Sequence, residues 1–156
     1  MEDIRVAVLI NEYNLGYQQH ASYLKNRLVQ SLSSMKLQVL KEIPRDYMPN
    51  AYDMGGGPGL AEKLKAMSAV ADMAVIGVVK ALLLDTSAGS SLYFSKTRAV
   101  VKIFDLASEL EMGGADLSLK VAGPDRDEAG RRGLEKMSVT ASRAVEKEVQ
   151  RILFGK

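Results

Sequence analysis

The chain has 156 residues, of which 47% are hydrophobic and 26% charged, and its 21 basic and 19 acidic side chains leave a formal charge of +2. This length and composition predict one globular domain over residues 1–156 and exclude an intrinsically disordered chain. The near-balanced charge argues against nucleic-acid binding by phosphate neutralisation. The chain has no cysteine and a single histidine, which excludes thiol chemistry and Cys/His metal sites.

Strand and helix patterns alternate in the first half of the chain. Residues 4–10 form an apolar, β-rich run that is typical of a buried strand. Leucines at helical spacing predict an amphipathic helix over residues 21–32, and a short strand follows at 37–40. Glycine and proline crowd residues 44–59, so we expect a long surface loop there.

The second half begins with a helix at residues 60–67 and continues with strands. Residues 73–84 are almost continuously apolar, which predicts a central strand. Residues 93–104 and 117–121 alternate between apolar and polar side chains, which indicates an antiparallel meander with one covered and one solvated face. Asp125 is the expected N-cap of a long C-terminal helix. The predicted fold class is α/β (α+β): a single-layer mixed sheet in the order strand, helix, strand, helix, three strands, helix, with the helices packed on the sheet.

Hydrogen-bonding side chains follow the first predicted strand. Asn11, Glu12 and Asn14 fall in an expected loop at its carboxyl end, where open α/β sheets commonly bind ligands. An ordinary turn explains Asn14 and the nearby Gly16 as well, and we favour that interpretation. Ligand binding at these residues is the minority hypothesis.

Three further patterns are better explained as ordinary structure than as sites. The glycine-rich segment 55–59 lacks the spacing of a phosphate-binding loop, and His20 has no nucleophile or orienting group beside it. Acidic residues around the predicted hairpin lack calcium-loop spacing and are typical of a solvated turn: Asp105, Glu109, Glu111 and Asp116. We therefore expect no catalytic residues, no cofactor and no metal.

Basic residues recur on one face of the strand predicted at 93–104. Lys96, Arg98 and Lys102 share its solvated face. Such charges are typical of a soluble surface, but Phe94 and Phe104 alternate onto the same face and would form a partner surface if they were exposed. The sequence thus offers this face, or a margin of the last helix, as an interface for a protein partner or a second copy.

Several segments resemble one known family in the same order along the chain. They are ADMAVIG at residues 71–77, RAVVKIFDLAS at 98–108, GGAD at 113–116 and the alanine-bearing helix at 129–153. Together they resemble the small α/β domain shared by curli-secretion lipoproteins of the CsgG type, the TolB amino-terminal domain and related envelope lipoproteins. Glu109 stands where that family's hairpin has a glycine, and the chain has no amino-terminal cysteine for lipidation.

The resemblance implies a non-catalytic domain that assembles or docks with partners in the periplasm or at the outer membrane, with peripheral membrane association through a lipid anchor that this chain lacks. The chain begins without a signal-like segment, so we expect either a removed leader or, as the alternative, a cytoplasmic protein. The competing hypothesis is an α/β protein or small enzyme that binds a small ligand or nucleotide with the loop after the first strand.

Overall fold

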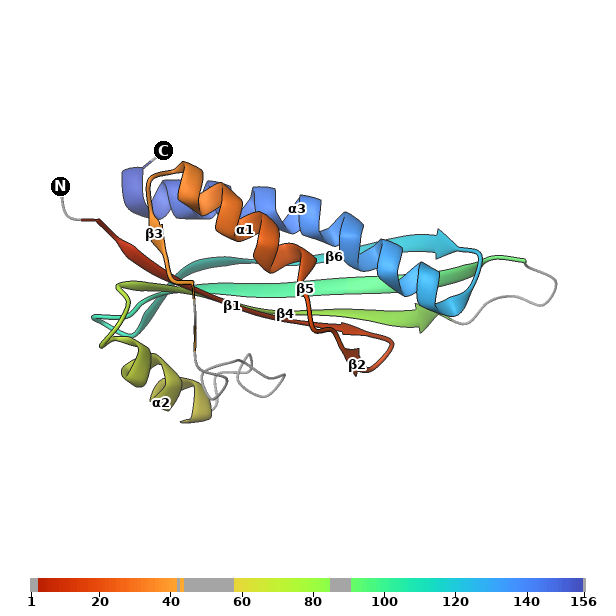
Figure 1. Cartoon of the computed structure of the whole chain (residues 1–156), viewed down its shortest axis with the longest axis horizontal. Coiled ribbons are helices and arrows are strands. Elements are labelled where there is room, and N and C mark those ends of the chain that lie inside the picture. The colour runs from red at the N-terminus through yellow and green to blue at the C-terminus, as the bar shows by residue number, and fades with distance from the viewer. Residues whose placement is uncertain (1–2, 42, 44–57, 85–90, 156) are drawn as a thin grey trace.

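The computed structural model describes residues 3–41, 43, 58–84 and 91–155. Its strands form one six-stranded sheet: β1 (Arg5–Asn14), β2 (Tyr17–Gln18), β3 (Gln38–Val39), β4 (Met73–Leu84), β5 (Tyr93–Asp105) and β6 (Leu110–Gly123). The helices in these residues are α1 (Tyr23–Ser34), α2 (Pro58–Met67) and α3 (Arg126–Phe154). The predicted mixed α/β fold with a long C-terminal helix is therefore confirmed (Figure 1).

Both parallel and antiparallel pairs occur in the sheet, whose main path is β2-β1-β4-β5-β6. Strand β1 is parallel to β3 and β4, whereas β4, β5 and β6 form an antiparallel meander. Strand β4 lies between β1 and β5, which confirms the central position predicted from its apolar run. An apolar strand suits this position because both of its faces are covered over much of its length.

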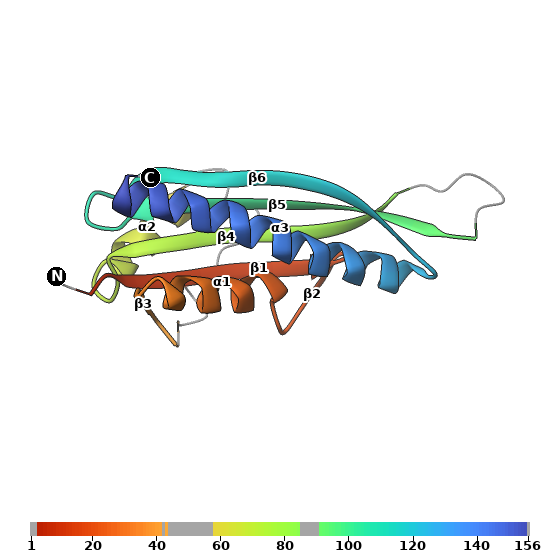
Figure 2. The same cartoon turned by 90° about the horizontal axis from the view of Figure 1, so that it is seen from above.

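Helices α1 and α3 cover one face of the sheet (Figure 2). Each helix buries one apolar stripe against the sheet, and α3 contributes Leu134, Met137, Ala141, Val145 and Val149. Side chains cap both helices, since the Ser22 hydroxyl accepts from the backbone N–H of Lys25 and the predicted cap Asp125 accepts from that of Glu128. These caps satisfy helix N–H groups that have no partner within the helix.

Helix α2 covers one end of the opposite face, which we call the outer face. Leu60, Leu64 and Met67 pack there against Leu9 and Phe104. Phe104 was expected on a solvated surface, but it is only 6% exposed because α2 lies over it. The outer face is therefore divided into a covered end and an end without α2.

Two predicted boundaries were wrong. Strand β1 continues through residues 11–14, where a loop was expected, and the turn follows at Leu15 and Gly16, both with positive φ. Strand β6 begins at Leu110 rather than at residue 117, because pairing with β5 continues past a bulge near Phe104. In the glycine-rich segment, residues 55–57 lie outside the described residues and Gly59 belongs to α2.

Candidate functional site

The residues predicted to bind a small ligand do not converge on one site. All three residues belong to β1, where successive side chains point to opposite faces of the sheet. Glu12 and Asn14 therefore share one face, and Asn11 lies on the other. Asn11 is on the outer face and accepts a hydrogen bond from the Gln18 side chain at 3.2 Å. Glu12 and Asn14 point toward α1 and α3, where their contacts are structural.

Glu12 holds the N-terminus of α1 in place. Its side chain is 1% exposed, and Oε2 accepts from the backbone N–H of Leu24 at 2.9 Å and from the Ser22 hydroxyl. Burial raises the pKa of Glu12, while these two hydrogen bonds lower it by a smaller amount. A carboxylate at this position is favoured by the positive end of the helix dipole. The contacts explain Glu12 as a helix anchor.

Two glycines let α3 approach the buried oxygens of the sheet. A Cβ atom added to Gly130 would lie 1.8 Å from Asn14 Oδ1, and one added to Gly133 would lie 2.2 Å from Thr97 Oγ1. These two oxygens have no conventional hydrogen-bond partner among the described residues. Contact with the glycine Cα–H groups is the weak interaction available to them. The helix itself therefore fills the space over Asn14 and Thr97.

The outer face carries the predicted interface residues on one surface. Lys96 and Arg98 are exposed and Lys102 is half-buried, which confirms that they share a face. Arg98 forms a two-point ion pair with Asp116 on β6, with N–O distances of 3.0 and 2.7 Å. The guanidinium holds the pKa of Asp116 below its usual range. Lys102 Nζ is 4.0 Å from Glu111 Oε1.

Pairing between strands adds basic residues that the sequence analysis did not single out. Lys80 lies directly opposite Arg98, and Lys120 lies directly opposite Lys96. Lys80 lies over the Tyr13 ring at 5.8 Å, and Lys120 lies 4.8 Å from the centre of the Phe94 ring. We call the resulting surface the basic outer face: Lys80, Lys96, Arg98, Lys102 and Lys120. Lys80 could have been found from the sequence, because it is the charged residue that interrupts the apolar run at 73–84.

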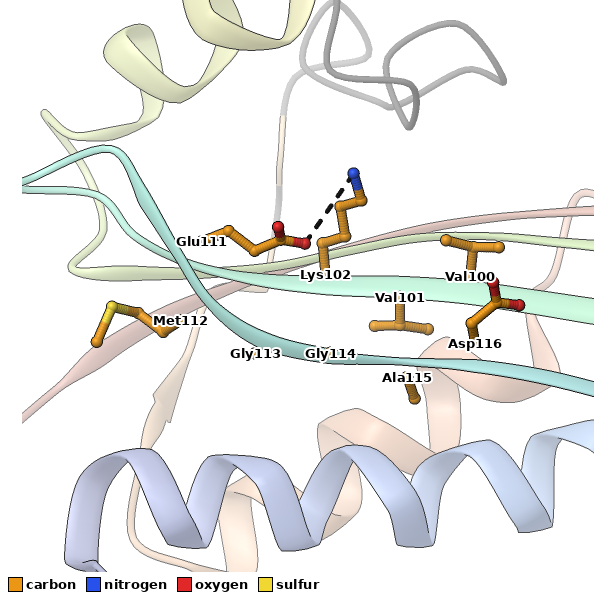
Figure 3. A pocket seen from close by; sticks show the side chains of 9 residues that line it. All are labelled: Val100, Val101, Lys102, Glu111, Met112, Gly113, Gly114, Ala115 and Asp116. Carbon is orange, nitrogen blue, oxygen red and sulfur yellow. Dashed lines mark ion pairs between the residues drawn. The ribbon is translucent and has the colours of Figure 1, made fainter.

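A shallow groove of about 520 Å³ follows the β5–β6 pair beside this surface. Figure 3 shows Lys102 and Glu111 on the side of the sheet away from α3, whereas Ala115 points toward α3. Gly113 and Gly114 leave the middle of the groove without side chains. A Cβ on Gly114 would lie 2.2 Å from the carbonyl oxygen of Val101, so the close approach of β6 to β5 requires glycine. The groove offers an open contact surface.

The remaining candidate residues lie apart from this surface or are already paired. Among the described residues, no group of three His, Asp or Glu side chains could hold a metal ion. Asp105 accepts a hydrogen bond from the Ser108 hydroxyl at 2.7 Å, and His20 is exposed just before α1. None of the helices in the described ranges is both long and apolar enough to cross a membrane.

Comparison with known proteins shows a shared fold and no family assignment. No family model and no curated protein match the chain. A DUF330 protein from Xanthomonas campestris is 12% identical over 96% of this chain and 87% of that chain, with a TM-score of 0.50. This likeness shows that the two chains share a fold.

Weaker likenesses include a TolB protein and a lipoprotein. TolB from Acinetobacter baumannii is 14% identical over 99% of this chain and 29% of TolB, with a TM-score of 0.47. A lipoprotein from Neisseria meningitidis is 14% identical over 94% of this chain and 97% of that chain, with a TM-score of 0.42. These scores are too low to assign function, so membership of the CsgG and TolB group stays a prediction.

Proposed function

We propose that the chain is a non-catalytic binding or assembly module of the bacterial cell envelope, and that it docks a protein partner through the basic outer face. The observation that carries this proposal is the placement of like charges on neighbouring strands. Lys80 and Arg98 are directly opposite, as are Lys96 and Lys120. Like charges in such pairs destabilise a sheet, and the carboxylate of Asp116 offsets part of this repulsion at Arg98. An acidic partner surface would offset this repulsion.

The end of the outer face beyond α2 also has the mixed chemistry of a protein interface. Leu82, which is 57% exposed, lies directly opposite Lys96. The half-buried rings of Tyr13 and Phe94 lie beneath Lys80 and Lys120. The rings and aliphatic stems give this surface apolar contact area beside its charges. These features favour a protein surface over a small ligand.

The contacts of Glu12 and Asn14 favour docking over small-ligand binding after β1. Both side chains are engaged with helices α1 and α3. An envelope location is part of the proposal because the sequence resembles the CsgG and TolB group.

The test compares two charge-reversed variants that change the net charge equally. The outer-face variant replaces Lys96, Arg98 and Lys102 by Glu. The control replaces three exposed basic residues of α3 by Glu: Lys136, Arg143 and Lys147. Each protein is used to capture binding partners from solubilised envelope fractions, and recovery is measured by quantitative mass spectrometry.

We expect a salt-sensitive partner to be recovered with the wild type and the α3 control and lost with the outer-face variant. Salt should weaken the contact because exposed charges are screened. Circular dichroism must show that all three proteins are folded. Equal recovery by the two variants would contradict docking through the basic outer face.

A further inference from the structure

Strand β6 lies at the margin of the sheet and pairs only with β5 among the described strands (Figure 2). Side chains of α3 reach the free side of β6 near both of its ends. Arg151 donates to the carbonyl of Met112 at 3.1 Å, and Glu148 accepts from the N–H of Gly114 at 3.4 Å. At the other end, Arg132 donates to the carbonyl of Ala122 at 3.4 Å. Helix α3 therefore caps both ends of this edge.

These contacts show which residues of β6 face outward. In an antiparallel strand, the N–H and C=O of one residue point to the same side, and successive residues alternate. The capped residues all have even numbers, so Asp116, Ser118 and Lys120 also direct their backbone groups to the free side. Within the described residues, no hydrogen bond reaches those groups. The centre of the edge is an open template for another strand.

We propose that a second copy of this chain pairs with this open edge, β6 against β6 in antiparallel orientation, about a two-fold axis at Ser118. This register places Asp116 opposite the partner's Lys120, and Lys120 opposite the partner's Asp116. Opposite charges in directly facing positions stabilise strand pairs. A C2 interface requires this kind of self-complementarity.

The same register also matches the apolar side chains of the other face. Leu117 comes to lie opposite the partner's Leu119, and both residues are half-buried under α3 in one copy. A register centred on Asp116 or on Lys120 would instead place like charges opposite each other. Pairing at Ser118 also gives Lys120, which faces Lys96 within its own chain, a carboxylate from the second copy. Charge and apolar contacts therefore favour this register over those centred on Asp116 or Lys120.

This inference goes beyond the proposed function, because it assigns a second surface and names its partner. The basic outer face and the β6 edge share the Lys120 side chain but differ in their main contacts. Docking on the face uses side chains, whereas pairing at the edge uses backbone N–H and C=O groups. Each proposal can therefore fail while the other holds.

The first test uses a cysteine at the expected axis, since the native chain has none. Facing residues of a hydrogen-bonded antiparallel pair have Cα atoms about 5.5 Å apart, which suits a disulfide. We expect Ser118→Cys to form covalent dimers under mild oxidation at least tenfold faster than Ser108→Cys, an exposed control in the turn before β6. Equal rates, or faster cross-linking at Asp116→Cys or Lys120→Cys, would overturn the proposed axis.

The second test measures mass by light scattering over a concentration series. We expect the wild type to reach twice its chain mass of 17.0 kDa. Ser118→Pro should remain monomeric, because proline removes an outward N–H that β5 does not use. Ser118→Ala is the matched control and should dimerise. A wild type that stays monomeric at every concentration would overturn the proposal.

The outer-face variant separates the two proposals. A dimer that survives the change of Lys96, Arg98 and Lys102 to Glu but is lost in Ser118→Pro supports pairing at the edge, whatever the outer face binds. A dimer that survives Ser118→Pro and is lost in the outer-face variant overturns edge pairing and assigns self-association to the outer face. If Ser118→Pro fails to fold, the cysteine cross-linking rates decide the question.

Discussion

Both faces of the sheet carry polar side chains, but the two faces use them differently. Under α1 and α3, Glu12 is 1% exposed and Thr97 is 0% exposed, and both lie in close contact with a helix. On the outer face, the Arg98 side chain is 61% exposed and its ion pair with Asp116 remains solvated. Burying polar groups costs stability, and on the covered face Glu12 spends its hydrogen bonds on the start of a helix. Exposed charges cost little and remain available to a partner.

Of the changes proposed below, Gly133→Ala on the covered face should have the largest effect on stability. The new Cβ would lie 2.2 Å from Thr97 Oγ1, so α3 or the threonine must move. We expect the free energy of unfolding to fall by about 1–3 kcal/mol, as is typical of an overpacked core. Urea denaturation measures this change.

A double variant shows whether Thr97 is the cause. Thr97→Ala removes the clashing oxygen, so Gly133→Ala should cost less in the Thr97→Ala background than in the wild type. The Ser95 hydroxyl oxygen, 3.0 Å from the same added Cβ, is present in both backgrounds. A difference between the two costs therefore reports on Thr97. If Gly133→Ala costs the same in both, the close approach of α3 over Thr97 does not limit stability.

A smaller effect should appear in the pH dependence set by Glu12. Burial raises the pKa of this carboxyl in the folded state above its ordinary value of 4.5, so the folded state binds its proton more tightly than the unfolded chain. The contribution of Glu12 to stability is therefore fully present below that ordinary value and is lost as the pH rises through the raised pKa. Glu12→Gln cannot ionise and should remove this dependence.

The measurement is the free energy of unfolding of wild type and Glu12→Gln from pH 4 to 8. We expect the wild type to lose stability relative to the variant as the pH rises across this interval. Asp116→Asn is the control of opposite sign and needs a second series that extends below pH 4, because Arg98 lowers the pKa of Asp116 from its ordinary value of 3.8 and that contribution is lost only as the pH falls through the lowered pKa. A difference between wild type and Glu12→Gln that does not vary with pH would contradict the role of burial.

The sequence was sufficient to predict the order of the main elements. Apolar spacing located α1 and α3, and the uninterrupted run in β4 identified the central strand. It was insufficient for the ends of β1 and β6. Residues 11–14 are mostly polar although they continue a paired strand, and Gly113–Gly114 interrupts the alternation that would have revealed β6. Strand pairing, rather than local pattern, determines both boundaries.

The candidate site was predictable only where it depended on one strand. The alternation of side chains along a strand was enough to predict that Lys96, Arg98 and Lys102 share one face of the sheet. The addition of Lys80 and Lys120 depends on register between strands, which no local pattern contains. The contacts between α3 and the two ends of β6 join residues far apart in sequence. The unpaired centre of the β6 edge could therefore be recognised only in the folded chain.

The smallest expected effect tests whether the outer face is kept at a cost to stability. Lys96→Thr removes the like-charge pair with Lys120 and keeps good strand propensity, so we expect the free energy of unfolding to rise by a few tenths of a kcal/mol at low salt. The gain should shrink in 0.5 M salt because the repulsion it relieves is screened. Lys25→Thr, which removes a lysine on α1, is the charge-matched control, with no gain expected because threonine is a poorer helix former. If Lys96→Thr instead loses stability at low salt, Lys96 makes favourable contacts within its own chain. The proposal of an acidic partner would then lose its main support.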